Sequence, residues 1–310
     1  MRQEREFLEL VVPHTVEERR LIASWIDIRD VTKALLLLLK VSVGALILAI
    51  GMSTTFTDVT YLWRRPGLLL RSLLAMYLLV PFAAFLLVKT VPLSAGVKAA
   101  LLVLAVSAGA PLLPRKLRRF GDDAYIFSLV VLSSLLAIVI VPPWIAALAW
   151  HFGISTELSI VDVAMSIGGA FLLPLTIGMV SRAVAPAPSE RFAGYASGVA
   201  GVALAVASLA LLVTHLQLLA AVHWQGMMAL IGMMLIGLAI GHILGGPDPD
   251  ERTALAIACV TRHVGVAVVV ATSFRGPRTA VMLAAYFLST ALVSIAYFQW
   301  RRRKARAPGA

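Results

Sequence analysis

Cys259-Val-Thr-Arg-His-Val-Gly265 lies in the middle of a long apolar run of the sequence. At the centre of a bilayer a charged side chain costs about 2.5 to 3.5 kcal/mol on insertion scales. Arg262 and His263 are therefore expected to face the protein interior or a cavity, and both are candidates for a functional site. The stretch also predicts a break in the helix that contains it.

A second interruption is predicted at Ser107-Ala-Gly-Ala-Pro-Leu-Leu-Pro114. Proline removes a backbone donor and disfavours helix at the preceding residue, and here two prolines follow Gly109 closely. A plain helix end followed by a loop is the alternative interpretation. Irregular backbone persists at membrane depth only where protein or a water-filled cavity surrounds it. Both interruptions are therefore expected inside the protein.

The composition indicates which solvent covers the chain. Of 310 residues, 60% are hydrophobic and 14% charged, and the mean hydropathy is +0.91. A soluble domain carries about a quarter charged residues, so this chain has too little polar surface to face water. The net charge of +11 lies largely in short basic clusters between apolar runs. Such clusters are typical of loops beside anionic lipid headgroups, which argues against nucleic acid as a partner.

The apolar runs predict an all-α membrane protein with about nine transmembrane helices, because a span needs roughly 20 residues. The predicted spans are 34–52, 67–89, 96–120, 124–149, 160–183, 192–215, 224–246, 253–274 and 278–300. Together they make 34–300 a transmembrane domain. Residues 301–310 are predicted to form a basic tail.

Residues 1–33 are predicted to be a polar N-terminal segment that does not cross the membrane. Its apolar residues would allow it to lie on the membrane surface, and a solvated linker helix is an equal alternative. The basic residues of the loops then predict the orientation of the spans. With a cytoplasmic C-terminus, the outside loops hold only Lys89, Arg275 and Arg278. The positive-inside rule thus predicts a multi-pass protein of the inner membrane with its C-terminus in the cytoplasm.

The two interruptions fall in the third and eighth predicted spans, five spans apart. Because five is odd, equivalent elements of two repeats would have opposite orientations in the membrane. This is the pattern of an inverted repeat, in which one unit lacks its first helix. Discontinuous helices at matching positions of two halves are typical of the binding site of a secondary transporter.

Four further stretches, taken in order, carry a resemblance to a known family. They are Gly51-Met-Ser-Thr-Thr-Phe-Thr57, Leu79-Val-Pro-Phe82, Phe171-Leu-Leu-Pro-Leu-Thr-Ile-Gly-Met179 and Arg252-Thr-Ala-Leu-Ala-Ile257. Their order and spacing resemble the bile acid:sodium symporter family over most of 34–300. The resemblance implies two inverted helical repeats, arranged as a panel and a core, with two broken helices that cross near the midplane. It also implies alternating-access transport of an organic anion such as a bile acid or a small carboxylate.

The chain differs from sodium-coupled members of that family at the site itself. The resemblance places Ala258, Arg262 and His263 where those members carry a glutamate and a glutamine-asparagine pair. Met76 stands where a glutamine is expected, and Pro111 follows the first interruption's glycine in place of a serine-asparagine pair. The oxygen ligands of sodium are lost, which favours transport without sodium coupling. A sodium-coupled symporter and a non-transporting receptor or scaffold with this fold are the alternatives.

The substituted site is predicted to bind an anion. Arginine stays charged and holds a carboxylate or sulfonate by two parallel hydrogen bonds, and histidine titrates near neutrality, so His263 is the candidate for ion coupling. In the alternative interpretation, Arg262 replaces sodium as a built-in cation that bonds to backbone carbonyls. The other candidates for substrate binding are Thr261, Gly109, Pro111, Ser107 and Ser134.

The sequence does not suggest an enzyme. It contains no HExxH and no GxSxG motif, and the spacing of its histidines does not resemble that of metal ligands. No cofactor and no metal are expected. A small organic anion and the lipid bilayer are the predicted partners, and the oligomeric state is not indicated.

Overall fold

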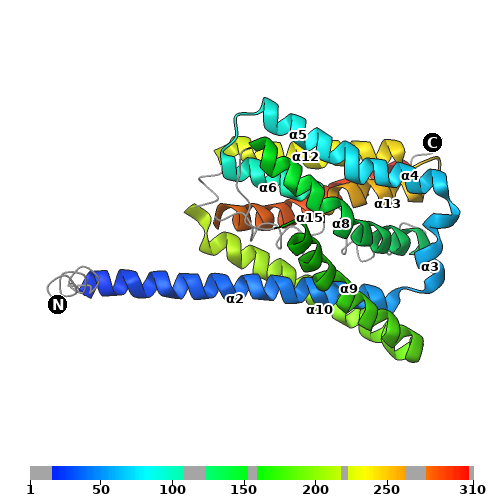
Figure 1. Cartoon of the computed structure of the whole chain (residues 1–310), viewed down its shortest axis with the longest axis horizontal. Helices are drawn as coiled ribbons and strands as arrows, with labels where there is room; N and C mark the ends of the chain where they lie inside the picture. The colour runs from blue at the N-terminus through cyan, green and yellow to red at the C-terminus, as the bar shows by residue number, and fades with distance from the viewer. Residues whose placement is uncertain (1–15, 108–122, 153–158, 218–222, 263–276, 307–310) are drawn as a thin grey trace.

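The computed structural model describes residues 16–107, 123–152, 159–217, 223–262 and 277–306, and this part of the chain contains helices and no strands. Figure 1 shows their arrangement. The helices are α2 (Val16–Ser53), α3 (Phe56–Thr60), α4 (Pro66–Leu73), α5 (Val80–Thr90), α6 (Ala95–Val106), α8 (Asp123–Phe152), α9 (Ile160–Val184), α10 (Pro186–Thr214), α12 (His223–Leu244), α13 (Pro249–Val260) and α15 (Pro277–Arg306). A 3₁₀ turn, η1 (Leu62–Arg64), precedes α4, and a π-helical segment, η2 (Leu74–Leu79), joins α4 to α5.

Six segments of the described residues are long and apolar enough to cross a membrane. They are Asp30–Ser53, Pro66–Thr90, Ala124–Ala147, Ile160–Val184, Pro186–Thr214 and Trp224–Leu244. Each agrees with one of the nine predicted spans, so the chain is a multi-pass membrane protein. Of the other three predicted spans, the third and eighth are described only as far as α6 and α13, and the ninth lies within α15. The count of nine and the inverted repeat stay predictions.

The first helix is longer than the sequence predicted. The expected span began at residue 34, whereas α2 is one continuous helix of 38 residues from Val16. At a rise of 1.5 Å per residue it is about 57 Å long, nearly twice the hydrocarbon thickness of a bilayer. Figure 1 shows its N-terminal part projecting beyond the other helices. The backbone therefore marks no boundary between the polar segment and the first span.

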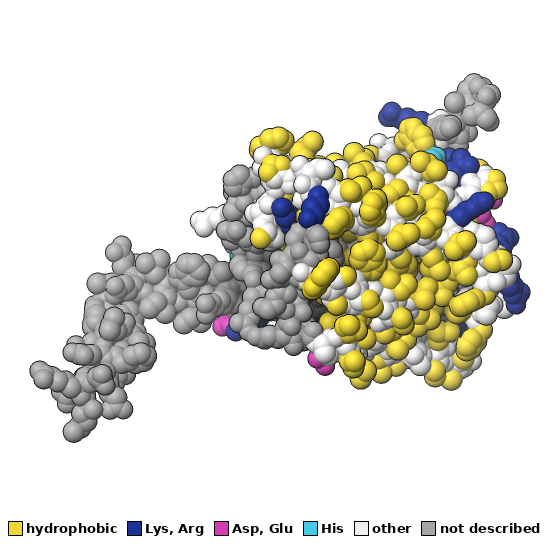
Figure 2. All heavy atoms as spheres, turned by 45° about the horizontal axis from the view of Figure 1, so that its top comes forward, with side chains coloured by type: hydrophobic (Ala, Val, Ile, Leu, Met, Phe, Trp, Pro, Cys, Tyr) yellow, Lys and Arg dark blue, Asp and Glu magenta, His cyan; other side chains and the backbone are white. Residues whose placement is uncertain are grey.

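The helices form two neighbouring groups. In Figure 1, α2, α9 and α10 lie on one side, and α4, α5, α6, α12 and α13 lie on the other; α2 packs against α9 and α10, and α12 packs against α13. The helices α8 and α15 lie between the groups: α8 packs against α9 and α6, and α15 packs against α10 and α6. The face shown in Figure 2 is largely apolar, and its basic side chains lie mainly near the margins of the apolar area, as expected for a protein surrounded by lipid.

Both predicted interruptions coincide with the end of a short helix. The helices α6 and α13 have 12 residues each, and from Leu101 and Thr253 to their last residues every position is buried. Ser107, after α6, has φ −75° and ψ 62°, and Thr261, after α13, has φ −85° and ψ 100°. Both residues leave helical geometry inside the protein. The chain beyond each lies outside the described residues, so the crossing of two broken helices stays a prediction.

Candidate functional site

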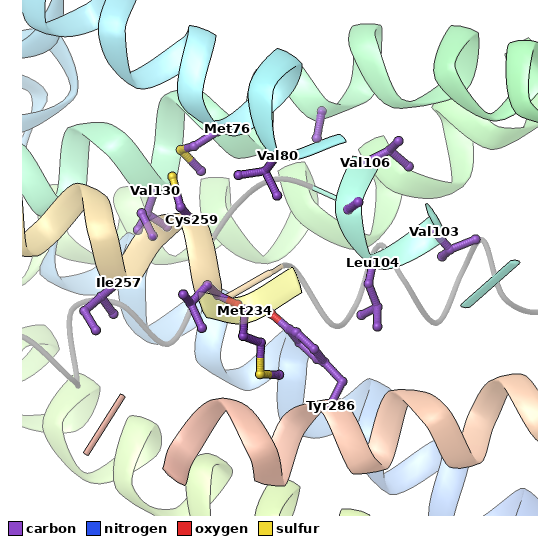
Figure 3. Packing of buried hydrophobic residues seen from close by; sticks show 14 of the residues in the cluster. Met76, Val80, Val103, Leu104, Val106, Val130, Met234, Ile257, Cys259 and Tyr286 are labelled. Atoms are coloured by element: carbon purple, nitrogen blue, oxygen red, sulfur yellow. Dashed lines mark hydrogen bonds between the residues drawn. The ribbon is translucent and has the colours of Figure 1, made fainter. Parts of the chain in front are cut away.

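The end of α13 is closed by a tyrosine from α15. The last helical bond runs from Thr261 N–H to the Ile257 carbonyl at 2.8 Å. The next N–H, that of Arg262, donates to the hydroxyl of Tyr286 at 2.5 Å, and this hydroxyl donates in turn to the Val260 carbonyl. Figure 3 shows Tyr286 reaching from α15 toward this helix end. One side chain thus satisfies a donor and an acceptor that the interrupted helix leaves unpaired.

Arg262 itself is buried, with 1% of its surface exposed, and is the only charged side chain that is buried among the described residues. The ion pairs found in this part of the chain involve Lys33, Arg65 and Arg182, and none involves Arg262. Among the described residues, no Asp or Glu is buried, so none is available in the interior to pair with Arg262. The described part of the protein therefore holds one positive charge in its interior without a negative partner.

One nitrogen of this guanidinium is anchored to the π segment. Nη1 of Arg262 donates to the Met76 carbonyl at 3.1 Å. This carbonyl has lost both of its normal backbone donors: Val80 N–H bonds to the Ala75 carbonyl, as a π turn requires, and Pro81 has no N–H. A buried carbonyl without a donor is unfavourable, so it makes a strong acceptor site for an arginine from another helix.

The other two nitrogens of the Arg262 side chain, Nε and Nη2, make no such bond within the described part of the chain. Nε and Nη2 of Arg262 are buried and have no hydrogen-bond partner among the described residues. Leaving a buried charged donor unpaired costs several kcal/mol, so the arrangement favours a ligand with negative charge at this edge of the guanidinium. Apolar side chains lie around the end of α13 in Figure 3, among them Met76, Val80 and Cys259.

Of the sequence-predicted site residues within the described part of the chain, Thr261 is adjacent to Arg262 in the sequence, and Ser134 and Ser107 are buried in or at the end of other helices. Thr261 is buried and directly precedes Arg262. Ser134 of α8 is buried and its Oγ has no partner in the described structure; its neighbour Ser133 accepts a hydrogen bond from Tyr77 of the π segment through its carbonyl. Ser107 is buried at the end of α6, where its Oγ donates to the Val103 carbonyl at 2.6 Å.

Three predicted site residues, Gly109, Pro111 and His263, lie outside the described residues. Two contributors were missed by the sequence interpretation, the hydroxyl of Tyr286 and the carbonyl of Met76. The proline of Val80-Pro81-Phe82 was only part of a signal for the second. In an ordinary helix Pro81 would free the carbonyl of Tyr77, and the π turn moves the free carbonyl to Met76. No spacing in the sequence indicates Tyr286.

The opposite end of α13 is held by charged and polar contacts. Asp248 caps the helix by accepting from the N–H groups of Asp250 and Glu251. Arg65 pairs with Glu251 at 2.6 Å, and Arg301 donates to the Thr253 hydroxyl at 3.0 Å and to the Pro249 carbonyl at 2.9 Å. The start of α13 is thus tied to the loop before α4 and to α15, which fixes the line along which the helix approaches the site.

A comparison with protein families agrees with this architecture. The family model described as "Sodium Bile acid symporter family" matches residues 40–222. The chain belongs to this family. Members of the family are membrane transporters rather than enzymes, and five of the six apolar spans lie wholly or partly within the matched residues. No match was found among curated proteins.

The family match ends before α12 and α13. Arg262 and Tyr286 therefore lie outside the matched residues, while Met76 and Pro81 lie within them. The site of this member of the sodium bile acid symporter family combines a matched π segment with a helix end that the match does not cover.

Proposed function

We propose that this protein is a secondary transporter of the inner membrane that carries a small organic anion by alternating access, without sodium coupling. The family supplies the transporter fold, and one observation supports the choice of an anion: the buried guanidinium of Arg262 has no carboxylate partner among the described residues. The desolvation of a single charge costs several kcal/mol, and a bound anion would offset this cost.

The same charge opposes a sodium ion at this position. Two positive charges about 4 Å apart repel by about 4 kcal/mol at an effective dielectric constant of 20. The Met76 carbonyl, an oxygen of the kind that binds sodium, already accepts from Arg262. Arg262 can therefore replace sodium as a cation bonded to a backbone carbonyl and also bind an anion. Its Nη1 donates to the Met76 carbonyl, while Nε and Nη2 stay available for the anion.

Transport requires that the site open to water, because Arg262 is buried in this conformation. In this proposal the two groups of helices move against each other, with α2, α9 and α10 on one side and the group that contains α13 on the other. In the proposed cycle His263, next to Arg262 in the sequence, carries a coupling proton. Thr261, Gly109, Pro111, Ser107 and Ser134 line the path in this proposal, and the C-terminus faces the cytoplasm.

The test is uptake of radiolabelled anions into proteoliposomes that contain the purified protein. Taurocholate, pyruvate and benzoate serve as probes, in sodium and in potassium buffers of equal ionic strength. We expect uptake of at least one probe that is the same in both cations and falls at least tenfold in Arg262→Gln. Sodium-dependent uptake, or full uptake by a folded Arg262→Gln variant, would contradict the proposal. No uptake of any probe would favour the receptor or scaffold alternative.

A further inference from the structure

We infer that Arg262 binds one carboxylate side-on, through the edge formed by Nε and Nη2, and that Pro81 is the residue that orients this edge. The inference rests on the proposed anion site and names the chemical group that the site recognises. It adds a positioning residue, Pro81, which lies on the span between Pro66 and Thr90 rather than on the broken helix.

The two unpartnered nitrogens are neighbours on one edge of the guanidinium plane. A guanidinium carries five N–H donors in a rigid fork, and the N–H groups of Nε and Nη2 point in the same direction. Two parallel N–H groups match the two oxygens of a carboxylate and form a bidentate pair. Nη1 already donates to Met76, so the side-on edge is the edge of Arg262 on which both nitrogens lack a partner among the described residues.

The charge of the site selects a monoanion. Arg262 is the only buried charge among the described residues, so one negative charge neutralises it and a dianion would leave an excess charge in the interior. A carboxylate has this charge and is planar, as the fork requires. A sulfonate has the same charge and can also place two oxygens on the fork, but its third oxygen would then lie in the apolar site without a donor.

Pro81 determines where the guanidinium is anchored. In an ordinary helix the Met76 carbonyl would accept from the N–H at position 80, and in a π turn from the N–H at position 81. Val80 N–H bonds to Ala75, and proline has no N–H at position 81, so the carbonyl is open to Nη1. With any other residue at 81, a backbone N–H would compete with Arg262 for this acceptor.

The chain offers matched controls for this role. Pro174 is also a proline inside a span, but it lies in α9, which packs against α2, α8 and α10. Pro174→Ala therefore supplies a new N–H far from the π segment. Arg262→Lys keeps the charge and removes the fork.

The test is binding of benzoate to the purified full-length protein, measured by calorimetry, with the neutral isostere benzamide and with benzenesulfonate as comparison probes. We expect benzoate to bind, benzamide not to bind, and benzenesulfonate to bind more weakly than benzoate. Arg262→Lys should weaken benzoate binding at least tenfold, and Pro81→Ala about tenfold. Pro174→Ala should bind benzoate like the parent protein. Pro81→Ser repeats the test with a second residue that has an N–H.

Several results would overturn the inference. Equal affinity in Arg262→Lys would show that charge alone is recognised, and unchanged affinity in both folded Pro81 variants would remove the positioning role. Absence of binding by benzoate, acetate and cholate alike would overturn the carboxylate assignment. These outcomes are separate from transport: benzoate binding without uptake contradicts the proposed function alone, whereas uptake that is unaffected in Arg262→Lys contradicts this inference alone.

Discussion

Gly51 of α2 and Gly178 of α9 pack backbone against backbone. A Cβ atom built on Gly178 would lie 2.9 Å from the Cα of Gly51 and 2.4 Å from the Leu48 carbonyl oxygen. One built on Gly51 would lie 2.4 Å from the Leu175 carbonyl oxygen. Helices in lipid gain no hydrophobic energy by associating, so small residues that permit this approach determine where they cross. The pair fixes the crossing of the two helices.

Gly178→Ala should therefore separate α2 from α9, since the added methyl group meets backbone that has no room to move. We expect a loss of about 1 to 3 kcal/mol of stability, seen as a lower melting temperature in detergent. Gly169→Ala is the control, because Gly169 lies on the same helix and a Cβ built on it meets nothing within 4 Å. Equal melting temperatures for the two variants would contradict the close contact.

A second close approach joins α12 to α13, the helix that carries the site at its end. A Cβ on Gly241 would lie 2.5 Å from the Cα of Ala256. Gly241→Ala should displace α13 and weaken anion binding as well as stability. Gly232→Ala, on the same helix, meets only the end of the Leu87 side chain at 3.9 Å and should be neutral. Calorimetry and thermal unfolding of both variants check this prediction.

Tyr286→Phe removes the hydroxyl that serves both the Arg262 N–H and the Val260 carbonyl. Each buried group left without a partner costs about 1 to 3 kcal/mol, so the variant should be clearly less stable. Tyr195→Phe, at a site that is 77% exposed, should not change stability. Thermal unfolding compares the two. A Tyr286→Phe variant as stable as the parent would show that the helix end finds other partners.

Arg262→Met should abolish anion binding without lowering the stability of the protein. Removing an uncompensated buried charge removes a desolvation cost of several kcal/mol, which outweighs the about 1 to 3 kcal/mol lost when the Met76 carbonyl has no donor, whereas anion binding should be lost. Without an anion we expect the variant to melt at the parent's temperature or above it. Arg191→Met, at an exposed position, should leave both properties unchanged. A strongly destabilised Arg262→Met would indicate that the arginine has a structural partner beyond Met76.

Sodium should not stabilise the protein specifically. A ligand present at 100 times its dissociation constant raises stability by about 2.7 kcal/mol, which a melting curve detects. We expect identical melting temperatures in sodium and in potassium at equal ionic strength. A higher value in sodium would mean that the chain keeps a sodium site despite its substitutions, and that it is a sodium-coupled symporter.

Much of the fold could be predicted from the sequence because the lipid bilayer imposes local rules. Every lipid-facing helix must be apolar over a fixed length, so hydropathy alone predicted six helices that the structure contains. Proline, glycine and a charge inside an apolar run predicted where α6 and α13 end. The start of α2 was not predicted, since charged residues interrupt the apolar ones over residues 16–33 and leave no apolar run that would reveal a helix.

The sequence by itself also determined that Arg262 is an internal charge, because a guanidinium cannot face lipid. Only the tertiary structure decided how this charge is held. Met76 lies 186 residues away and Tyr286 lies 24 residues away, and both meet Arg262 because helices distant in the chain pack together. Such contacts leave no periodic signal in the sequence. The π turn and Pro81 free one carbonyl, and packing alone brings the arginine to it.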